Sequence, residues 1–173
     1  GKAITEQEIG KQLLHEIVSY AETSVCRRKF ILHYFGEGFD EKKCNEQCDN
    51  CRNPRERTEG SRYVEMLLNS IVLMDETQKS KHYCAYLSGH VTADIKAYKH
   101  DKLPTFGIGK EQDEHFWNAV IRQVTVGGLV YKDVETFGTL KLTDAGKAFI
   151  KAPTSFQLIK QHDFSGTDDD DSI

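Results

Sequence analysis

Long apolar runs are missing from this 173-residue sequence, since no stretch approaches the roughly 20 residues that a membrane-spanning helix needs. The sequence also lacks a signal peptide at its start, which argues against a secreted protein. The first residue is Gly1 and not an initiator Met, so we expect a piece of a longer protein. Hydrophobic residues at 38% and charged residues at 29% are typical of a soluble globular chain, which at this length forms one ordinary domain or two small ones.

Net positive charge, the usual mark of a nucleic-acid binder, is missing as well. The chain has 27 acidic residues against 23 Lys and Arg, but four of the acids form one run at residues 168–171. Without the segment 165–173 the acidic count falls to 23 and equals the basic count. Any affinity for DNA must therefore come from local clusters of Lys and Arg, and we expect it to be moderate and sensitive to salt.

A phosphate-binding loop of the form G-x-x-x-x-G-K-[ST] does not occur in the sequence. The segment 107–110 reads G-I-G-K, but it has neither the spacing nor the Ser or Thr that binds magnesium. The sequence therefore predicts that this chain alone does not hydrolyse ATP.

Two amphipathic stretches near the N-terminus predict a pair of helices. In the first, over residues 5–20, apolar residues recur at helical spacing and a Thr is followed three residues later by Glu, which is a capping box. The second covers residues 24–35 and ends at glycines. Two helices joined so closely are expected to form a hairpin. The polar stretch 50–60 is expected to be a linker, so we place a first unit at residues 1–60.

The rest of the chain predicts helices followed by a β-hairpin, which together make a winged helix. Helical periodicity covers residues 62–74, 80–88, 92–98 and 113–126, and strand patterns cover residues 129–134 and 139–142. We place this second unit at residues 61–153. The segment 154–173 loses the pattern and ends in small, polar and acidic residues, so we expect a disordered tail there.

Four of the five cysteines lie in one short region with the spacing C-x17-C-x3-C-x2-C. They are Cys26, Cys44, Cys48 and Cys51. Zinc takes four thiolates at the corners of a tetrahedron, and short loops between cysteines bring the ligands around one ion. Two disulfides are the alternative, but they rarely persist in a reducing compartment. We expect a structural zinc ion and read Cys84, which lies among apolar residues, as a buried core cysteine.

The predicted fold is thus mainly α with a small β wing, in which a helical-hairpin zinc-binding subdomain precedes a winged-helix domain. The runs CRRKFILHYFGE and CNEQCDNC resemble the zinc module of the RecQ helicase family. The run HDKLPTFGIGKEQDEHFWNAVIRQVTVGGLV is similar to the winged-helix (RQC) segment of that family, and LKLTDAG fits its second wing strand. The resemblance covers about residues 24–148.

The resemblance implies a parent enzyme that couples ATP hydrolysis to 3′-to-5′ unwinding of DNA, with ATP and Mg²⁺ bound in two motor lobes that precede this region. The implied partners are duplex DNA, junctions of single and double strands, the motor lobes in cis and repair proteins, with no membrane among them. The implied location is the bacterial cytoplasm, beside the nucleoid, or the nucleus of a eukaryote. We favour a bacterial protein because the wing is short.

Six residues are candidate DNA contacts in such a module. Lys96, Lys99, His100 and Lys102 form a cluster that two nearby aspartates partly cancel. Lys110 and the backbone amides after the preceding glycine lie where a helix begins, a place that favours phosphate, and the alternative is a solvated lysine.

The sixth candidate contact is Phe137, at the tip of the wing, which either stacks on a terminal base pair or folds back onto the core. Arg122 is expected to be a structural ion-pair partner more than a DNA contact. Arg27 or Arg28 is expected to brace the motor lobe more than to contact DNA. The leading hypothesis is a DNA-binding module that engages junctions and supports the motor, and the alternative is a protein-interaction or scaffolding module that braces the helicase core.

Overall fold

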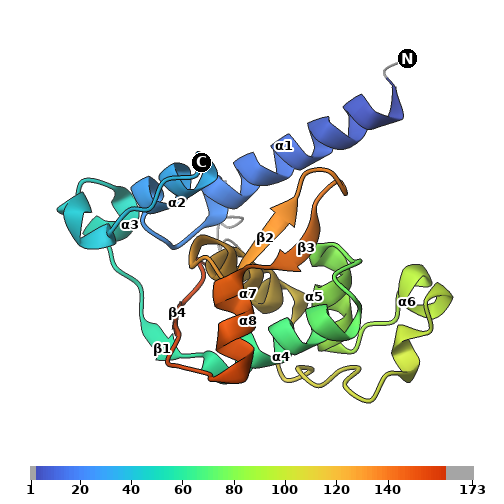
Figure 1. Cartoon of the computed structure of the whole chain (residues 1–173). Helices are drawn as coiled ribbons and strands as arrows, with labels where there is room; N and C mark the ends of the chain where they lie inside the picture. Colours follow the sequence, from blue (N-terminus) through green and yellow to red (C-terminus); the bar gives the residue numbers. More distant parts are fainter. Residues whose placement is uncertain (1–2, 163–173) are drawn as a thin grey trace, which may run out of the picture.

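Residues 3–162 are described by the computed structural model, and they begin with a helical unit that carries the four clustered cysteines (Figure 1). Its elements are α1 (Ile4–Glu22), α2 (Arg27–Tyr34), the 3-10 helix η1 (Glu41–Cys44) and the one-turn helix α3 (Asp49–Arg52). The two long helices match those predicted from the sequence. The short helix α3 occupies the start of the stretch that was expected to be linker.

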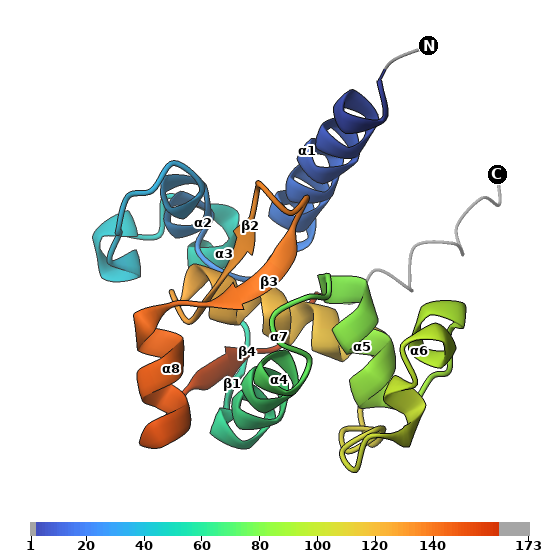
Figure 2. The ribbon, with the colours of Figure 1, turned by 45° about the vertical axis from the view of Figure 1, so that its right-hand side comes forward.

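The winged helix follows and has the predicted order of helices and strands. Its elements are β1 (Arg57–Glu59), α4 (Ser61–Leu73), α5 (Ser80–Ser88), α6 (Ala93–Ala97), η2 (His100–Lys102), α7 (Glu114–Val126), β2 (Val130–Asp133), β3 (Thr139–Leu142), α8 (Asp144–Lys151) and β4 (Gln157–Ile159). The fold is therefore mainly helical with a small β wing, as the sequence predicted, and it has a second small antiparallel sheet of β1 and β4 that the sequence did not predict. The elements α6 and η2 form an excursion between α5 and α7, at one edge of the molecule (Figure 2).

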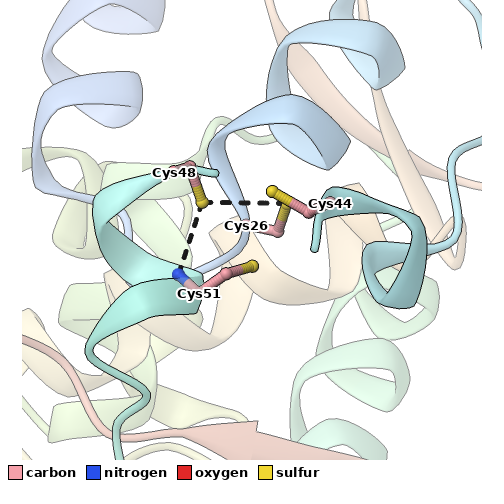
Figure 3. Close-up of side chains that lie close together, drawn as sticks. All are labelled: Cys26, Cys44, Cys48 and Cys51. Carbon is pink, nitrogen blue, oxygen red and sulfur yellow. Dashed lines mark hydrogen bonds between the residues drawn. The ribbon is translucent and has the colours of Figure 1, made fainter. Parts of the chain in front are cut away.

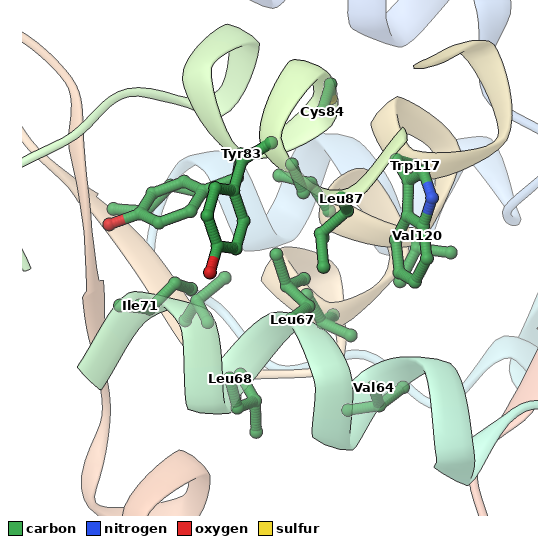
Figure 4. Packing of buried hydrophobic residues seen from close by; sticks show 14 of the residues in the cluster. Val64, Leu67, Leu68, Ile71, Tyr83, Cys84, Leu87, Trp117 and Val120 are labelled. Atoms are coloured by element: carbon green, nitrogen blue, oxygen red, sulfur yellow. The ribbon is translucent and has the colours of Figure 1, made fainter. Parts of the chain in front are cut away.

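The core of the winged helix lies where α4, α5 and α7 meet (Figure 4). Its centre is the single tryptophan, Trp117, which is fully buried and donates from Nε1 to the carbonyl of Gly109 at 3.1 Å. A Cβ at Gly109 would lie 2.1 Å from Cζ2 of Trp117, so only glycine fits at that position. The G-I-G-K turn is thus explained by core packing.

The wing is the hairpin of β2 and β3, in which Val130 pairs with Leu142 and Asp133 pairs with Thr139. Both strands lie within the ranges that the sequence predicted. At the tip, Phe137 and Gly138 have positive φ angles of 57° and 96°. The amide of Gly138 donates to the carbonyl of Asp133 at 2.8 Å, which closes the turn.

The ordered fold continues past residue 153, where the sequence predicted that the domain ends. Strand β4 pairs with β1 so that Thr58 faces Leu158, and this brings the segment after α8 back to the linker. The side chain of Leu158 is 5% exposed and occupies the space beside Gly60. The boundary prediction failed because three residues of strand carry too little periodicity to be recognised. Residues 163–173, which end the predicted disordered tail and contain the acidic run, lie outside the described residues.

Helix α1 turns its polar side toward the winged helix. Three carboxylates along this side form ion pairs with cations of the winged helix: Glu8 with Lys79 at 3.5 Å, Glu16 with Lys132 at 3.0 Å, and Glu22 with Arg122 at 3.2 Å. The opposite side of α1 is apolar and exposed. It carries Ile9, Leu13, Leu14, Ile17 and Val18.

A small second core joins the two predicted units. It consists of Val25 and Phe30 from the zinc unit and Val126 at the end of α7, with Tyr20 and Ile159 packed against them. The predicted units therefore share apolar contacts in addition to the ion pairs of α1. None of the helices between residues 3 and 162 combines the length and the apolar character that a membrane span requires.

Candidate zinc site and nucleic-acid interface

The four clustered cysteines converge on one point (Figure 3). Cys26 immediately precedes α2, Cys44 ends η1, Cys48 immediately precedes α3, and Cys51 lies within α3. All four Sγ atoms lie within 4.8 Å of one another. The Sγ atoms of Cys26 and Cys48 are 4.0 Å apart, about twice the length of a disulfide bond, and all four thiols are free. The disulfide alternative is therefore excluded for this arrangement.

The spacing of the sulfurs fits a tetrahedral zinc ion. Zinc–sulfur bonds of about 2.3 Å place the corners of such a tetrahedron about 3.8 Å apart. The separation of 4.0 Å between Cys26 and Cys48 is close to this value, and four thiolates are a donor set that structural zinc sites use. Four protein ligands leave no open position on the metal, so the site supports folding and no chemistry at the ion.

Backbone amides around the cysteines prepare one of them to bind metal. Burial raises the pKa of Cys26 and of Cys51 above the usual range of a thiol. Burial acts in the same direction on Cys48, but hydrogen bonds from the backbone N–H groups of Arg27 and Cys51 outweigh it and lower the pKa of Cys48 to about 7. The N–H of Cys51 lies 3.3 Å from Sγ of Cys48. These hydrogen bonds therefore favour the thiolate form of Cys48, which is the form that binds zinc.

Arg27 holds the zinc unit together through contacts with α1 and α3, and its bracing of a motor lobe stays a prediction. Its Nε and Nη2 donate to the two carboxylate oxygens of Asp49 at 2.6 and 3.0 Å, and its Nη1 donates to the carbonyl of Tyr20 at 2.5 Å. The guanidinium also lies 5.3 Å from the centre of the Tyr20 ring. Arg27 therefore ties α1, α2 and α3 around the cysteines, while Arg28 donates to Gln47 on the surface.

The predicted lysine cluster lies on α6 and η2, and two of its members share one carboxylate. Asp101 accepts from Nζ of Lys96 at 3.1 Å and lies 3.9 Å from Nζ of Lys102. The hydrogen bond from Lys96 lowers the pKa of Asp101. Asp101 therefore offsets part of the positive charge of this cluster, as the sequence suggested. Lys99 is exposed and makes no ion pair among the residues that the structure describes.

An exposed aromatic residue that sequence reasoning missed lies beside these lysines. Tyr98 is 59% exposed, and its ring stacks on that of His100 with centroids 5.4 Å apart and an angle of 20° between the planes. Cations beside an exposed ring are typical of surfaces that bind nucleic acid by phosphate contact and stacking. The signal in the sequence was a tyrosine beside lysines in a short polar segment, which offers few apolar neighbours for a buried ring.

The backbone amide of Lys110, one of those predicted to bind phosphate, already has a hydrogen-bond partner within the chain. The amide of Lys110 donates to Gly107 at 3.1 Å, and the first turn of α7 is capped by Asp113, whose carboxylate accepts from the amide of Phe116 at 2.7 Å. A carboxylate at this helix end repels an anion. Lys110 stays a predicted DNA contact through its exposed side chain alone.

The wing tip leans on α1. Gly138 lies against the side chain of Gln12, at 3.4 Å from an ideal Cβ position, and Lys132 on the wing pairs with Glu16. Phe137 is partly exposed and belongs to neither hydrophobic core of the described residues, so its stacking on a base pair stays a prediction. The wing is therefore supported along one side by the zinc unit (Figure 2).

Two side chains of α7 have structural roles. Arg122 is 7% exposed and pairs with Glu22, as expected for a structural ion pair. Burial lowers the pKa of Arg122, and the charge of Glu22 opposes this. Gln123, which sequence reasoning did not single out, pairs with the backbone of Ile159: its Nε2 donates to the carbonyl and its Oε1 accepts from the amide, both at 2.8 Å. Gln123 thus holds strand β4 in place.

The fold and the cysteine cluster define a zinc-binding helical unit joined to a winged helix. A family model for the RQC domain matches residues 54–166, and one for RecQ zinc-binding matches residues 2–52. The chain therefore belongs to the RecQ helicase family and comprises its zinc-binding and RQC domains. The RQC domain of these helicases is a DNA-binding winged-helix module, and the four-cysteine site is a structural zinc site.

Individual relatives agree with the family models. The chain is 30% identical to the ATP-dependent DNA helicase RecQ of Haemophilus influenzae over 154 residues, which cover 88% of this chain and 25% of that protein. It is 28% identical to the ATP-dependent DNA helicase RecQ of Bacillus subtilis, over 82% of this chain and 24% of that protein. It is 34% identical to the ATP-dependent helicase SGS1 of Saccharomyces cerevisiae, over 58% of this chain and 7% of that protein. The chain thus spans about a quarter of the length of the bacterial relatives.

Proposed function

We propose that this chain is the DNA-handling part of a RecQ helicase, which engages duplex DNA at a junction with single-stranded DNA and supports unwinding by an ATPase motor. The observation that carries the proposal is the edge formed by α6 and η2. It combines Lys99, which has no ion-pair partner within residues 3–162, with the exposed ring of Tyr98 beside His100. Backbone phosphates bind the cation, and an unpaired base at a junction stacks on the ring.

The lack of net positive charge sets the expected strength of binding, since the formal net charge of the chain is −4 and becomes zero only without residues 165–173. Lys96 and Lys102 keep part of their charge engaged with Asp101, so few cations are free to neutralise phosphates. Each phosphate contact contributes about 0.9 to the slope of the logarithm of affinity against the logarithm of salt concentration. We therefore expect a small slope, of about two to four, and modest affinity at physiological salt.

Fluorescence anisotropy of a labelled duplex with a 3′ single-stranded overhang tests the proposal. The chain should bind this DNA more tightly than a blunt duplex at low salt, and more weakly as salt increases. Charge reversal at Lys99 and Lys110 should weaken binding several-fold and lower the salt slope by about two. Lys147 is exposed and belongs to α8, a helix that lies far from α6 in both views, so Lys147→Glu is the matched control (Figures 1 and 2). Equal binding to both DNAs, or no effect of the reversal, would contradict the proposal.

A second function, bracing of the helicase motor, is supported by the exposed apolar side of α1. The ion pairs fix the polar side of α1 on the winged helix, and this leaves a row of five aliphatic side chains facing solvent. Contiguous apolar surface of this kind marks a contact with another protein surface. In the helicases that match this chain, most of the protein lies outside the matched segment, and the motor is the partner that we propose for this face.

Glutamate substitutions at Leu14 and Ile17 separate bracing from DNA binding. Both side chains are exposed, so the chain alone should keep its thermal stability and its affinity for the overhang duplex. In the full-length parent, the same double variant should lower the melting temperature and uncouple ATP hydrolysis from unwinding. A parent that melts and unwinds normally would contradict the bracing role and leave the DNA-binding role intact.

A further inference from the structure

Two histidines share a hydrogen bond behind the lysine edge. His82 lies on α5 and is 9% exposed, and its Nε2 lies 2.7 Å from Nδ1 of His100 at the start of η2. The two rings are nearly perpendicular, with an angle of 82° between their planes. A single proton lies between the two nitrogens, because a hydrogen bond of this kind has one donor and one acceptor. The tautomer of one ring therefore determines the tautomer of the other.

Aromatic rings enclose the pair and fix its position. His82 contacts Tyr83 on its own helix and the ring of Tyr98 after α6, both edge-on, and Tyr98 in turn stacks on His100. The titratable groups that act on His82 are His100 and Asp94, of which Asp94 lies on α6. The cluster thus links α5, α6 and η2, which are the elements that present the lysine edge.

Both imidazoles are neutral at neutral pH. Burial lowers the pKa of His82, and the neighbouring His100 lowers it further, while Asp94 opposes the shift. Burial also lowers the pKa of His100. One added proton preserves the hydrogen bond, since an imidazolium donates well to a neutral imidazole. A second proton would place two like charges 2.7 Å apart, so the pair takes up one proton at most near neutral pH.

We propose that His100 donates from Nε2 to a DNA backbone phosphate, that His82 is the positioning residue that fixes this tautomer, and that the pair takes up one proton when the phosphate binds. The inference rests on the proposed DNA-binding function of this edge. In the neutral pair, Nε2–H of His82 donates to Nδ1 of His100, so the proton of His100 sits on Nε2.

Proton uptake rearranges the pair without breaking it. The buffer supplies one proton, which adds to Nδ1 of His82, and the proton on Nε2 of His82 moves across the hydrogen bond to Nδ1 of His100. His100 then carries protons on both nitrogens and one positive charge, and His82 accepts from it. A phosphate stabilises this charge, as Lys99 beside it stabilises the phosphate.

Anisotropy titrations of the overhang duplex between pH 8 and pH 6 at constant ionic strength test the inference. The affinity of the unmodified chain should increase as the pH falls, by up to about tenfold per pH unit. Calorimetry in two buffers of different ionisation enthalpy should report uptake of up to one proton on binding. His115→Gln, at an exposed histidine on α7, is the matched control and should keep both properties.

Variants of the pair separate positioning from charge. His100→Gln should flatten the pH profile and abolish proton uptake, and because His100 is partly exposed the chain should remain folded. In His82→Gln, the amide nitrogen replaces Nε2 as the donor, so affinity at pH 8 should be retained while the pH dependence is reduced. His82→Leu removes the donor and should lower affinity at pH 8 as well.

The outcomes distinguish this inference from the function on which it rests. A His100→Gln variant that binds with the same pH profile and the same proton uptake would overturn the role of the pair but keep the proposed DNA binding. An unmodified chain that binds no DNA at low salt would overturn both. Equal behaviour of His82→Gln and His82→Leu would show that His82 only fills space.

Discussion

Replacing Leu158 with alanine should lower the free energy of unfolding by about 3 kcal/mol. Leu158 is 5% exposed and belongs to the main hydrophobic core, although it follows the point at which the sequence pattern fades. Substitutions of buried leucine by alanine cost about 2–5 kcal/mol, and a site at the edge of a core falls toward the middle of that range. For a chain of this size, each kcal/mol shifts the melting temperature by about 2–4 °C. The melting temperature should therefore fall by about 6–12 °C.

Removal of all residues after 153 should lower the free energy of unfolding more than Leu158→Ala does. The truncation deletes β4 and leaves both polar atoms of the Gln123 amide without their partners on Ile159. Each buried polar group left unpaired costs about 1–3 kcal/mol in addition to the lost apolar contact. The total, on the order of 5 kcal/mol or more, approaches the whole stability of many domains. The truncated chain should be partly unfolded at 37 °C.

Circular dichroism and the fluorescence of Trp117 follow both changes during urea and thermal unfolding. Lys160→Ala is the control, because this exposed lysine follows the same strand. It should change the free energy of unfolding by less than about 0.5 kcal/mol. A Leu158→Ala variant as stable as the control, or a truncated chain as stable as the full chain, would refute the conclusion that β4 is part of the fold.

Three further predictions concern the zinc site, the α1 contact and pH. Cys44→Ala should abolish stoichiometric zinc binding and unfold the zinc unit, while the fluorescence of Trp117 in the winged helix should change much less. A variant that still binds one zinc ion per chain would contradict the ligand assignment. A double-mutant cycle on Glu16 and Lys132 should give a coupling energy of about 0.2–1 kcal/mol that decreases with salt, and zero coupling at low salt would count against the observed pair. Burial is the main cause that lowers the pKa of five histidines in the folded chain. The unfolded chain therefore binds more protons than the folded chain below about pH 6.5. The urea concentration at the midpoint of unfolding should thus be lower at pH 5.5 than at pH 7. These histidines are His15, His33, His82, His100 and His162. A midpoint that stays constant would contradict this linkage.

The sequence predicted the helices and the wing well because their stabilising pattern is local. Helix α5 and strand β3 have the predicted bounds, α4 begins and ends one residue earlier than predicted, and α7 begins one residue later. Periodicity identifies such elements because each has one face against the core. The zinc ligands could be predicted from the sequence equally well, since their spacing along the chain reflects the geometry of the ion.

The orientation of α1 and the role of β4 were beyond the reach of the sequence. Periodicity shows that α1 is amphipathic but does not say which side meets the rest of the chain, and here the polar side does. Strand β4 depends on contacts with residues far away in the chain, among them Gly60 and Gln123. The link between His82 and His100 likewise depends on how α5 packs beside η2.

The pairing of β1 with β4 gives the winged helix a particular mechanical character. Arg57 faces Ile159, so the chain enters and leaves this module at one point. A load applied between the zinc unit and anything beyond residue 159 would separate the three residue pairs of this sheet one after another, starting at this end. Because Leu158 and both partners of the Gln123 amide leave the core together with β4, such a load would also destabilise the winged helix. The adjacent ends also make residues 57–159 a cassette suited to transplantation into another protein.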